Sequence, residues 1–296
     1  MINSKLKFLV VGTISNASKR FQPDMDKIAV ALSSLGRVEY FLVESDSHDS
    51  TPRILKTLKA ENLDFDFKSL GELRTRFPDR IERIRHCRNV YVEYIRNRYS
   101  ERKWDYVVVA DLDGMNSRVT TAGVKSSISK MNNWDALFAN QKHGYYDLFA
   151  LRSSDWVECD LLKILRVDEG AGQEKSQKRN PLGYLRNQKI RQEVLYSKMR
   201  RIPRDSEVIR VDSAFGGLGI YKTEMFLEFD YSLTDGELPD GSEHLTFHQK
   251  CIDEGFSLGI NPEMINATYN EYNINKHYLI RFLKDFKRNL RHRKAG

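Results

Sequence analysis

The stretch DYVVVADLDG, residues 105–114, predicts a buried strand that ends in two carboxylates. Four consecutive apolar residues precede Asp111, a run typical of a strand covered on both faces. Residues i and i+2 of an extended segment project to the same side, so Asp111 and Asp113 can converge on one cation. Ligands bind at the carboxyl ends of strands in open parallel sheets. We therefore expect this pair to hold Mn²⁺ or Mg²⁺ through carboxylate oxygens.

An Asp-x-Asp triplet is a weak motif when it stands alone. Acidic residues are common at strand ends, where they cap the following loop, and this structural role is the alternative for Asp111 and Asp113. The preceding apolar run and the following Gly114 favour the metal site.

Strand-like and helix-like patterns alternate on either side of this stretch. The predicted strands are residues 5–14, 38–43, 63–67 and 135–139, and the predicted helices are residues 24–35, 51–60 and 79–99. In the longest helix, apolar residues recur every three to four positions from Ile84 to Ile95. The alternation predicts an α/β fold with a mostly parallel, doubly wound (Rossmann-like) central sheet flanked by helices. We expect residues 135–139 to lie next to residues 105–110.

The chain of 296 residues is long enough for one large catalytic domain, expected over residues 1–277. Within it, residues 161–210 form a basic helical excursion rich in Lys, Arg, Gln and Asn. Hydrophobic residues make up 40% and charged residues 30%, which is a globular composition. The three cysteines are dispersed and lack zinc or disulfide spacing. The one early apolar run is too short for a membrane span, so we expect a cytoplasmic setting.

Residues 278–296 form a basic amphipathic stretch at the end of the chain. Its pattern predicts a helix that contacts the inner face of a membrane peripherally, with the apolar side inward and cations toward acidic headgroups. A helix docked on the domain fits the pattern equally well. The net charge of +7 also fits a nucleic-acid-binding protein, but no recognised binding motif is present, so we expect no nucleic acid.

Five segments, in this order, resemble a known family. They are RIRHCRNVYVEYI (83–95), DYVVVADLDG (105–114), YYDLFALR (145–152), DSAFGGLGIYKTEMF (212–226) and SEHLTFH (242–248). Together they resemble the GT-A type glycosyltransferases, specifically the group of fungal capsule-associated α-1,3-mannosyltransferases and their bacterial relatives.

The resemblance implies a GT-A fold and a hexosyltransferase of polysaccharide biosynthesis. Such an enzyme moves a sugar from a nucleotide-diphosphate sugar to a glycan or lipid-linked glycan. The first strand with its loop and residues 161–210 do not match the family, so neither donor sugar nor stereochemistry is implied. A metal-dependent nucleotidyltransferase can also hold its divalent cation with an Asp-x-Asp pair and is the enzymatic alternative.

Asp111 is expected to be shared between the metal site and the ribose of the donor, and five more polar residues are candidate contacts of the donor nucleotide. Glu44 and Asp46 follow the second predicted strand, where a carboxylate can accept from a base N–H or a ribose hydroxyl; a polar turn is the alternative. Arg85, Arg88 and Asn89 share one face of the long helix and can reach a diphosphate, although a solvated face explains them as well. The resemblance points to Arg88 and Asn89.

Tyr146 and Asp147 suit a sugar, because an aromatic ring stacks on it while a carboxylate accepts its hydroxyls. We assign Asp147 to the donor side and Tyr146 to the acceptor, with strand packing as the alternative. Gly216 and Gly217 let the backbone approach an acceptor closely, which the resemblance also implies; a bulged strand connection is the alternative.

Glu243 is the first candidate for the base that removes the acceptor proton in an inverting transferase, and Asp240 is the second. In a retaining enzyme the same acid would instead position the acceptor. A late histidine often completes a metal site of this architecture. His248 is the preferred third ligand, ahead of His244 and His277.

Overall fold

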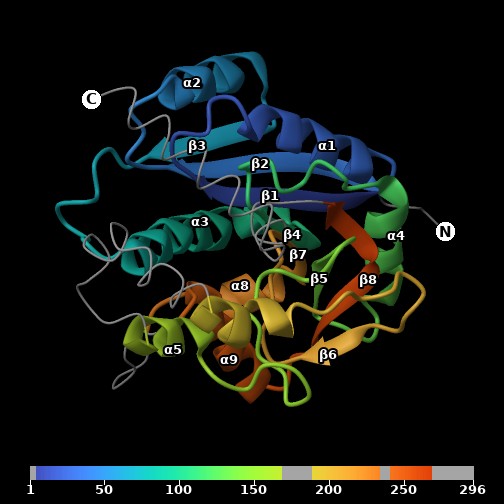
Figure 1. Ribbon diagram of the computed structural model, residues 1–296. Helices are drawn as coiled ribbons and strands as arrows, with labels where there is room; N and C mark the ends of the chain where they lie inside the picture. Colours follow the sequence, from blue (N-terminus) through green and yellow to red (C-terminus); the bar gives the residue numbers. More distant parts are fainter. Residues whose placement is uncertain (1–4, 169–188, 234–240, 269–296) are drawn as a thin grey trace.

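The computed structural model describes residues 5–168, 189–233 and 241–268 (Figure 1). The elements in these ranges are β1 (Leu6–Ile14), α1 (Phe21–Ser33), β2 (Gly36–Glu44), α2 (Thr51–Glu61), β3 (Phe65–Ser69), α3 (Arg80–Arg102), β4 (Tyr106–Ala110), α4 (Thr121–Lys130), β5 (Ala136–Gln141), α5 (Leu161–Asp168), the 3₁₀ turn η1 (Tyr196–Lys198), β6 (Ile209–Val211), β7 (Leu218–Lys222), α8 (Glu224–Glu228), α9 (Glu243–Asp253) and β8 (Leu258–Ala267). Asp240, His277 and the helix expected over residues 278–296 lie outside the described residues.

In the described part of the chain, eight strands form one sheet in the order β3-β2-β1-β4-β7-β5-β8-β6. The pairs β3-β2, β2-β1, β1-β4 and β5-β8 are parallel. Strand β7 runs antiparallel between β4 and β5, and β6 runs antiparallel to β8 at the edge. The prediction of an α/β fold with a mostly parallel central sheet is confirmed.

The expectation that β5 lies beside β4 is wrong, because β7 separates them. On one edge of β7, Leu218 pairs with Ala110 of β4. On the other edge of β7, Ile220 pairs with Leu137 of β5. The segment that precedes β7 is therefore brought directly to the carboxyl end of β4.

Side chains alternate between two apolar layers along the central strands, as period-2 geometry requires. In β1, Leu9 and Val11 belong to the layer under α3, whereas Phe8 and Val10 belong to the layer with Ile28 of α1. Figure 1 shows α1 and α3 on opposite sides of the sheet. Both faces of the inner strands are covered, which explains why their sequences are continuous apolar runs.

Helix α3 begins after Asp79, whose carboxylate accepts from the backbone N–H groups of Ile81 and Glu82 at 2.8 and 3.1 Å. This N-cap satisfies two of the four free donors at a helix start. The helix ends at Lys103, which has a left-handed φ of 51°. The cap therefore fixes where α3 starts beside the carboxyl ends of β1 and β2.

The segment 161–210 is less of an excursion than its composition predicts. In its described part, Leu195, Tyr196, Met199 and Ile202 are buried in the main apolar core. Among the helices within the described ranges, none combines the length and apolarity needed to cross a membrane.

Candidate active site

A cavity of about 590 Å³ lies at the carboxyl ends of β1, β2 and β4. Helix α3 and the first turn of α9 close its sides. Eight of the residues proposed from the sequence line it: Asp46, Arg88, Asp111, Asp113, Tyr146, Asp147, Glu243 and His244. Their convergence from segments up to about 200 residues apart makes this cavity the candidate active site.

Asp111 and Asp113 extend from the end of β4 into the cavity. The backbone N–H of Asp111 donates to the carbonyl of Gly217 at 3.0 Å, which extends the β4-β7 ladder by one residue. The Asp111 side chain keeps 38% of its surface open. Burial and the charge of Asp113 raise the pKa of Asp111 to about 7, against the opposing effect of Arg88. A cation bound by both carboxylates would reduce the repulsion between their negative charges.

The chemistry of this pair fits a hard cation such as Mn²⁺ or Mg²⁺. Within the described residues, no group of three or more His, Cys, Asp or Glu side chains is arranged to hold a metal. Two protein carboxylates are nevertheless enough for a cation that keeps waters and takes substrate phosphates as its remaining ligands.

Arg88 lies between two acids of the cavity. Its Nε donates to Oε1 of Glu243 at 2.8 Å, and its Nη2 lies 3.9 Å from Oδ1 of Asp111. Nη1 donates to the hydroxyl of Tyr91 at 3.1 Å. Two of the three guanidinium nitrogens therefore already donate to protein atoms. The guanidinium can meet a diphosphate beside Asp111 only through the Nη2 edge.

Asn89 and Arg85 do not line the cavity. The Asn89 side chain donates to Ser232 Oγ and accepts from the N–H of Tyr231, so it anchors the loop after α8. Arg85 is buried, and its Nε and Nη2 make no hydrogen bond. The shared helical face was predicted from spacing, but only its Arg88 position faces the cavity.

Glu44, predicted as a donor contact, has its carboxylate engaged by other residues of the fold. It is 2% exposed, accepts from the Ser47 N–H at 3.2 Å, and also pairs with the Ser69 hydroxyl. It does not border the cavity.

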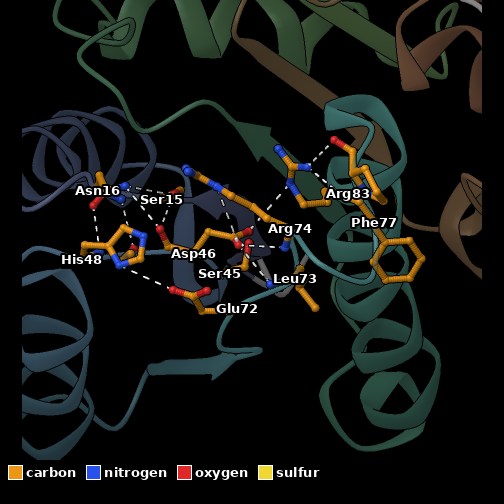
Figure 2. Close-up of polar contacts among 12 residues, drawn as sticks. Ser15, Asn16, Ser45, Asp46, His48, Glu72, Leu73, Arg74, Phe77 and Arg83 are labelled. Carbon is orange, nitrogen blue, oxygen red and sulfur yellow. Dashed lines mark hydrogen bonds and ion pairs between the residues drawn. The ribbon is translucent and has the colours of Figure 1, made fainter.

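Asp46 does border the cavity, and Figure 2 shows that it also ties several loops together. Its Oδ1 accepts from the N–H groups of Leu73 and Arg74 at 2.9 and 3.1 Å, and Arg83 Nε lies 3.8 Å from Oδ2. Burial disfavours its charge, but these donors outweigh that effect and hold the pKa of Asp46 below its usual value. Asp46 shapes the cavity rim as a clamp.

Tyr146 and Asp147 also line the cavity. Oδ2 of Asp147 accepts from the N–H of Gly216 at 3.0 Å. Burial raises the pKa of Asp147 to about 6, although the backbone N–H groups of Gly216 and Ala150 oppose it. Asp147 therefore joins the glycine loop to the site while presenting carboxylate oxygen to the cavity.

Gly216 and Gly217 shape the site without lining it. Their φ angles are +69° and +84°, and a Cβ on Gly216 would lie 2.8 Å from the carbonyl of Ala139. Glycine is needed here for left-handed backbone and close approach. The loop carries β7 to the end of β4, and its predicted contact with an acceptor stays a prediction.

Three buried amide side chains hold this loop, and none of them was predicted from the sequence. Gln141 and Asn266 donate to the carbonyl of Gly216 at 3.0 and 2.8 Å. Asn116 donates to the carbonyls of Asp111 and Gly217 at 2.6 and 3.2 Å. No local motif marks these residues, because they meet from three separate segments.

His248, predicted as the preferred third metal ligand, does not line the cavity. It is fully buried, with Nδ1 2.8 Å from Ser213 Oγ and Nε2 3.1 Å from the hydroxyl of Tyr221. Both ring nitrogens are occupied in the core below the cavity. His244, one turn earlier, borders the cavity instead.

One wall of the cavity is apolar and was not predicted. Phe149, Leu162, Leu195 and Phe215 contribute to it. Leu162 and Leu195 come from the segment 161–210, whose local composition gave no sign that it would reach the site.

No family model and no curated protein matches this sequence. Among solved structures, the chain is similar to S. aureus TarS 1-349 in complex with UDP-GlcNAc, with 14% identity, a TM-score of 0.48, and coverage of 90% of this chain and 59% of that one. It is also similar to the mannosyltransferase PcManGT from Pyrobaculum calidifontis in complex with GDP-Man and Mn²⁺, with 14% identity, a TM-score of 0.47, and coverage of 95% and 64%. A third similar structure is 4-diphosphocytidyl-2C-methyl-D-erythritol synthase from Anaerococcus prevotii, with 10% identity, a TM-score of 0.42, and coverage of 96% and 97%.

The chain spans 59% and 64% of the two transferases, less than two thirds of either. TM-scores below 0.5 carry no argument about the activity of this chain. The resemblance to the capsule-associated mannosyltransferase group is not confirmed by these matches. The assignment of function therefore rests on the site.

Proposed function

We propose that this protein is a metal-dependent glycosyltransferase that uses a nucleotide-diphosphate sugar. The observation that carries the proposal is that the Asp111–Asp113 pair, Arg88 and Glu243 lie together in the cavity, with Arg88 between Asp111 and Glu243. The two aspartates suit a cation and a diphosphate. Glu243 provides a carboxylate that an acceptor hydroxyl can reach.

Asp111 and Asp113 would hold Mn²⁺ or Mg²⁺ at the end of β4. When bound there, the cation supplies neutralisation of the charge that develops on the leaving diphosphate. The Nη2 edge of Arg88, 3.9 Å from Asp111, adds a fixed positive group on the same side. Asp46 and the loops that it clamps form the end of the cavity assigned to the nucleotide, and Asp147 faces the donor sugar.

Glu243 acts on the acceptor. In an inverting reaction, the acceptor hydroxyl gives its proton to Glu243 as its oxygen forms a bond to the anomeric carbon. The bond from that carbon to the diphosphate oxygen breaks, and the nucleoside diphosphate leaves with the electron pair. In a retaining reaction, Glu243 positions the acceptor instead.

The acceptor class is a glycan or lipid-linked glycan. Tyr146 and the apolar wall of Phe149, Leu162 and Leu195 support an acceptor that offers apolar surface beside its hydroxyls. Peripheral membrane contact through residues 278–296, which lie outside the described ranges, would bring such an acceptor to the site. Liposome flotation with and without these residues tests that contact, and equal flotation of the two forms would remove it.

A panel of nucleotide sugars, incubated with Mn²⁺ or Mg²⁺, tests the activity itself. We expect release of a nucleoside diphosphate with at least one donor, and loss of the release in EDTA. Release of pyrophosphate from a nucleoside triphosphate and a sugar phosphate would instead identify a nucleotidyltransferase.

A further inference from the structure

His244 is a buried side chain of the cavity whose polar atoms have no partner. It lies in the first turn of α9, is 2% exposed, and borders the cavity. Neither Nδ1 nor Nε2 makes a hydrogen bond. Buried polar groups are rarely left unsatisfied, and such an exception in a native fold calls for an explanation.

Packing holds the imidazole of His244 in one place. Its ring stacks on Phe215, with centroids 4.0 Å apart and planes 25° apart, and it contacts the edge of Tyr231 at 5.9 Å. Burial, then the charge of Arg88 and the nearby His248, hold the pKa of His244 well below its usual value. A neutral imidazole offers one N–H donor and one acceptor nitrogen.

His248 shows what a purely structural histidine looks like in the same helix. It lies one turn further on, and hydroxyl groups satisfy both of its nitrogens. The two rings stack at 5.5 Å, so they share a similar environment. The difference between them is that His244 borders the cavity and lacks partners.

Nε2 of His244 lies 3.8 Å from Oε1 of Glu243. This separation is longer than a direct hydrogen bond, and a single oxygen atom about 2.8 Å from each of the two atoms would bridge them. A hydroxyl at that position gives its proton toward Glu243 and accepts from the imidazole N–H.

We propose that His244 is a positioning residue that binds the reacting acceptor hydroxyl together with Glu243. This inference rests on the proposed function, because the hydroxyl is the one that attacks the donor sugar. His244 fixes the direction of the oxygen lone pair while Glu243 takes the proton. It lies on the acceptor side, so donor binding does not depend on it.

The test compares His244→Phe with His244→Gln, using a nucleotide sugar and Mn²⁺ without added acceptor, so that water takes the place of the hydroxyl. We expect His244→Phe to lower kcat for nucleoside diphosphate release by at least about 10-fold with donor KM unchanged. His244→Gln, which keeps a polar group, should recover part of that loss. Unchanged kcat in His244→Phe, or a loss that appears in KM alone, would overturn the proposal.

A comparison of Tm between two variants tests, without measuring turnover, whether the ring nitrogens of His244 lack hydrogen-bond partners in the folded protein. His244→Phe and His248→Phe enlarge the ring equally, but only the second removes two hydrogen bonds. We expect His248→Phe to lower Tm by about 3 °C or more beyond the change in His244→Phe. Equal losses would show that His244 has structural partners and would overturn its role. If the wild type turns over no donor, the proposed function fails, and this comparison still decides whether His244 is unpartnered.

Discussion

Arg88 Nε donates to Glu243 Oε1 across 2.8 Å and so joins the middle of α3 to the first turn of α9. The two residues are 3% and 7% exposed. Tyr91 accepts a second hydrogen bond from the guanidinium, and the rings of Phe215 and Tyr231 lie 5.4 and 5.5 Å from its central carbon. This enclosure fixes the Glu243 carboxylate at the edge of the cavity, where the proposed chemistry needs it.

Replacing Glu243 by Gln should separate chemistry from folding. The amide oxygen can still accept from Arg88, so we expect the protein to fold, with a lower Tm because the Arg88 charge loses its partner charge. Without a base, kcat for nucleoside diphosphate release should fall by about 10²–10⁴-fold while donor KM stays the same. Glu228→Gln, at an exposed position of α8, is the control and should keep full turnover. Activity within threefold of wild type in Glu243→Gln would exclude this residue as the base.

Arg88→Met should destabilise the fold strongly, because it leaves Glu243 buried without its partner. We expect the free energy of unfolding to fall by about 3–5 kcal/mol, measured by urea denaturation. The matched control is Arg98→Met. It breaks an ion pair with Glu101 in which the two side chains are 49% and 63% exposed, and should cost less than about 1 kcal/mol. Similar losses in the two variants would argue against a buried, interdependent pair.

The glycine loop offers a test of positioning through the backbone. Gly217 and Gly255 have φ angles of +84° and +88°, so alanine is strained at both by about 1 kcal/mol. A Cβ at Gly217 would also lie 3.2 Å from the Tyr146 hydroxyl, whereas nothing lies within 4 Å at Gly255. We expect only Gly217→Ala to weaken Mn²⁺-dependent donor binding, because its carbonyl holds the N–H of Asp111. Equal donor affinity in both variants, measured by calorimetry, would contradict this role.

Asp147 should make stability depend on pH. Its pKa in the folded protein is raised from 3.8 to about 6, so the folded state binds the proton more tightly than the unfolded chain does. The stabilising contribution is therefore complete at low pH and is lost as pH rises through about 6. The Tm of wild type relative to Asp147→Asn should fall between about pH 4 and pH 6 and stay level above that range. Parallel Tm curves across these pH values would show that Asp147 does not titrate in this way.

Much of the fold follows from local patterns in the sequence. The apolar run before Asp111 and the periodicity of α3 identify buried strands and a covering helix. The insertion of β7 between β4 and β5 could not be predicted in this way, because strand order depends on long-range pairing. Antiparallel pairing of Leu218 with Ala110 leaves no mark in either segment alone.

In the candidate site, too, local patterns identify some residues, whereas the positions of others depend on long-range contacts. Asp111, Asp113 and Glu243, which all line the cavity, could be proposed from the sequence because each follows or opens a recognisable element. Spacing placed His244 and His248 on one helical face, but it could not tell which turn reaches the cavity and which is covered by core hydroxyls. The partners of Glu44, Ser47 and Ser69, could not be predicted from the sequence because only the fold brings them to its carboxylate.

The most direct test of the central claim is calorimetry of nucleotide-sugar binding in the presence and absence of Mn²⁺. It compares wild type, Asp113→Asn and a control, Asp205→Asn, which changes an exposed carboxylate away from the cavity. We predict that wild type and the control bind the donor only when Mn²⁺ is present. Asp113→Asn, with unchanged Tm, should lose at least about 10-fold in donor affinity, because a carboxylate ligand of the cation is gone. Donor binding that is equal in all three proteins, or that persists in EDTA, would contradict a metal site at the end of β4.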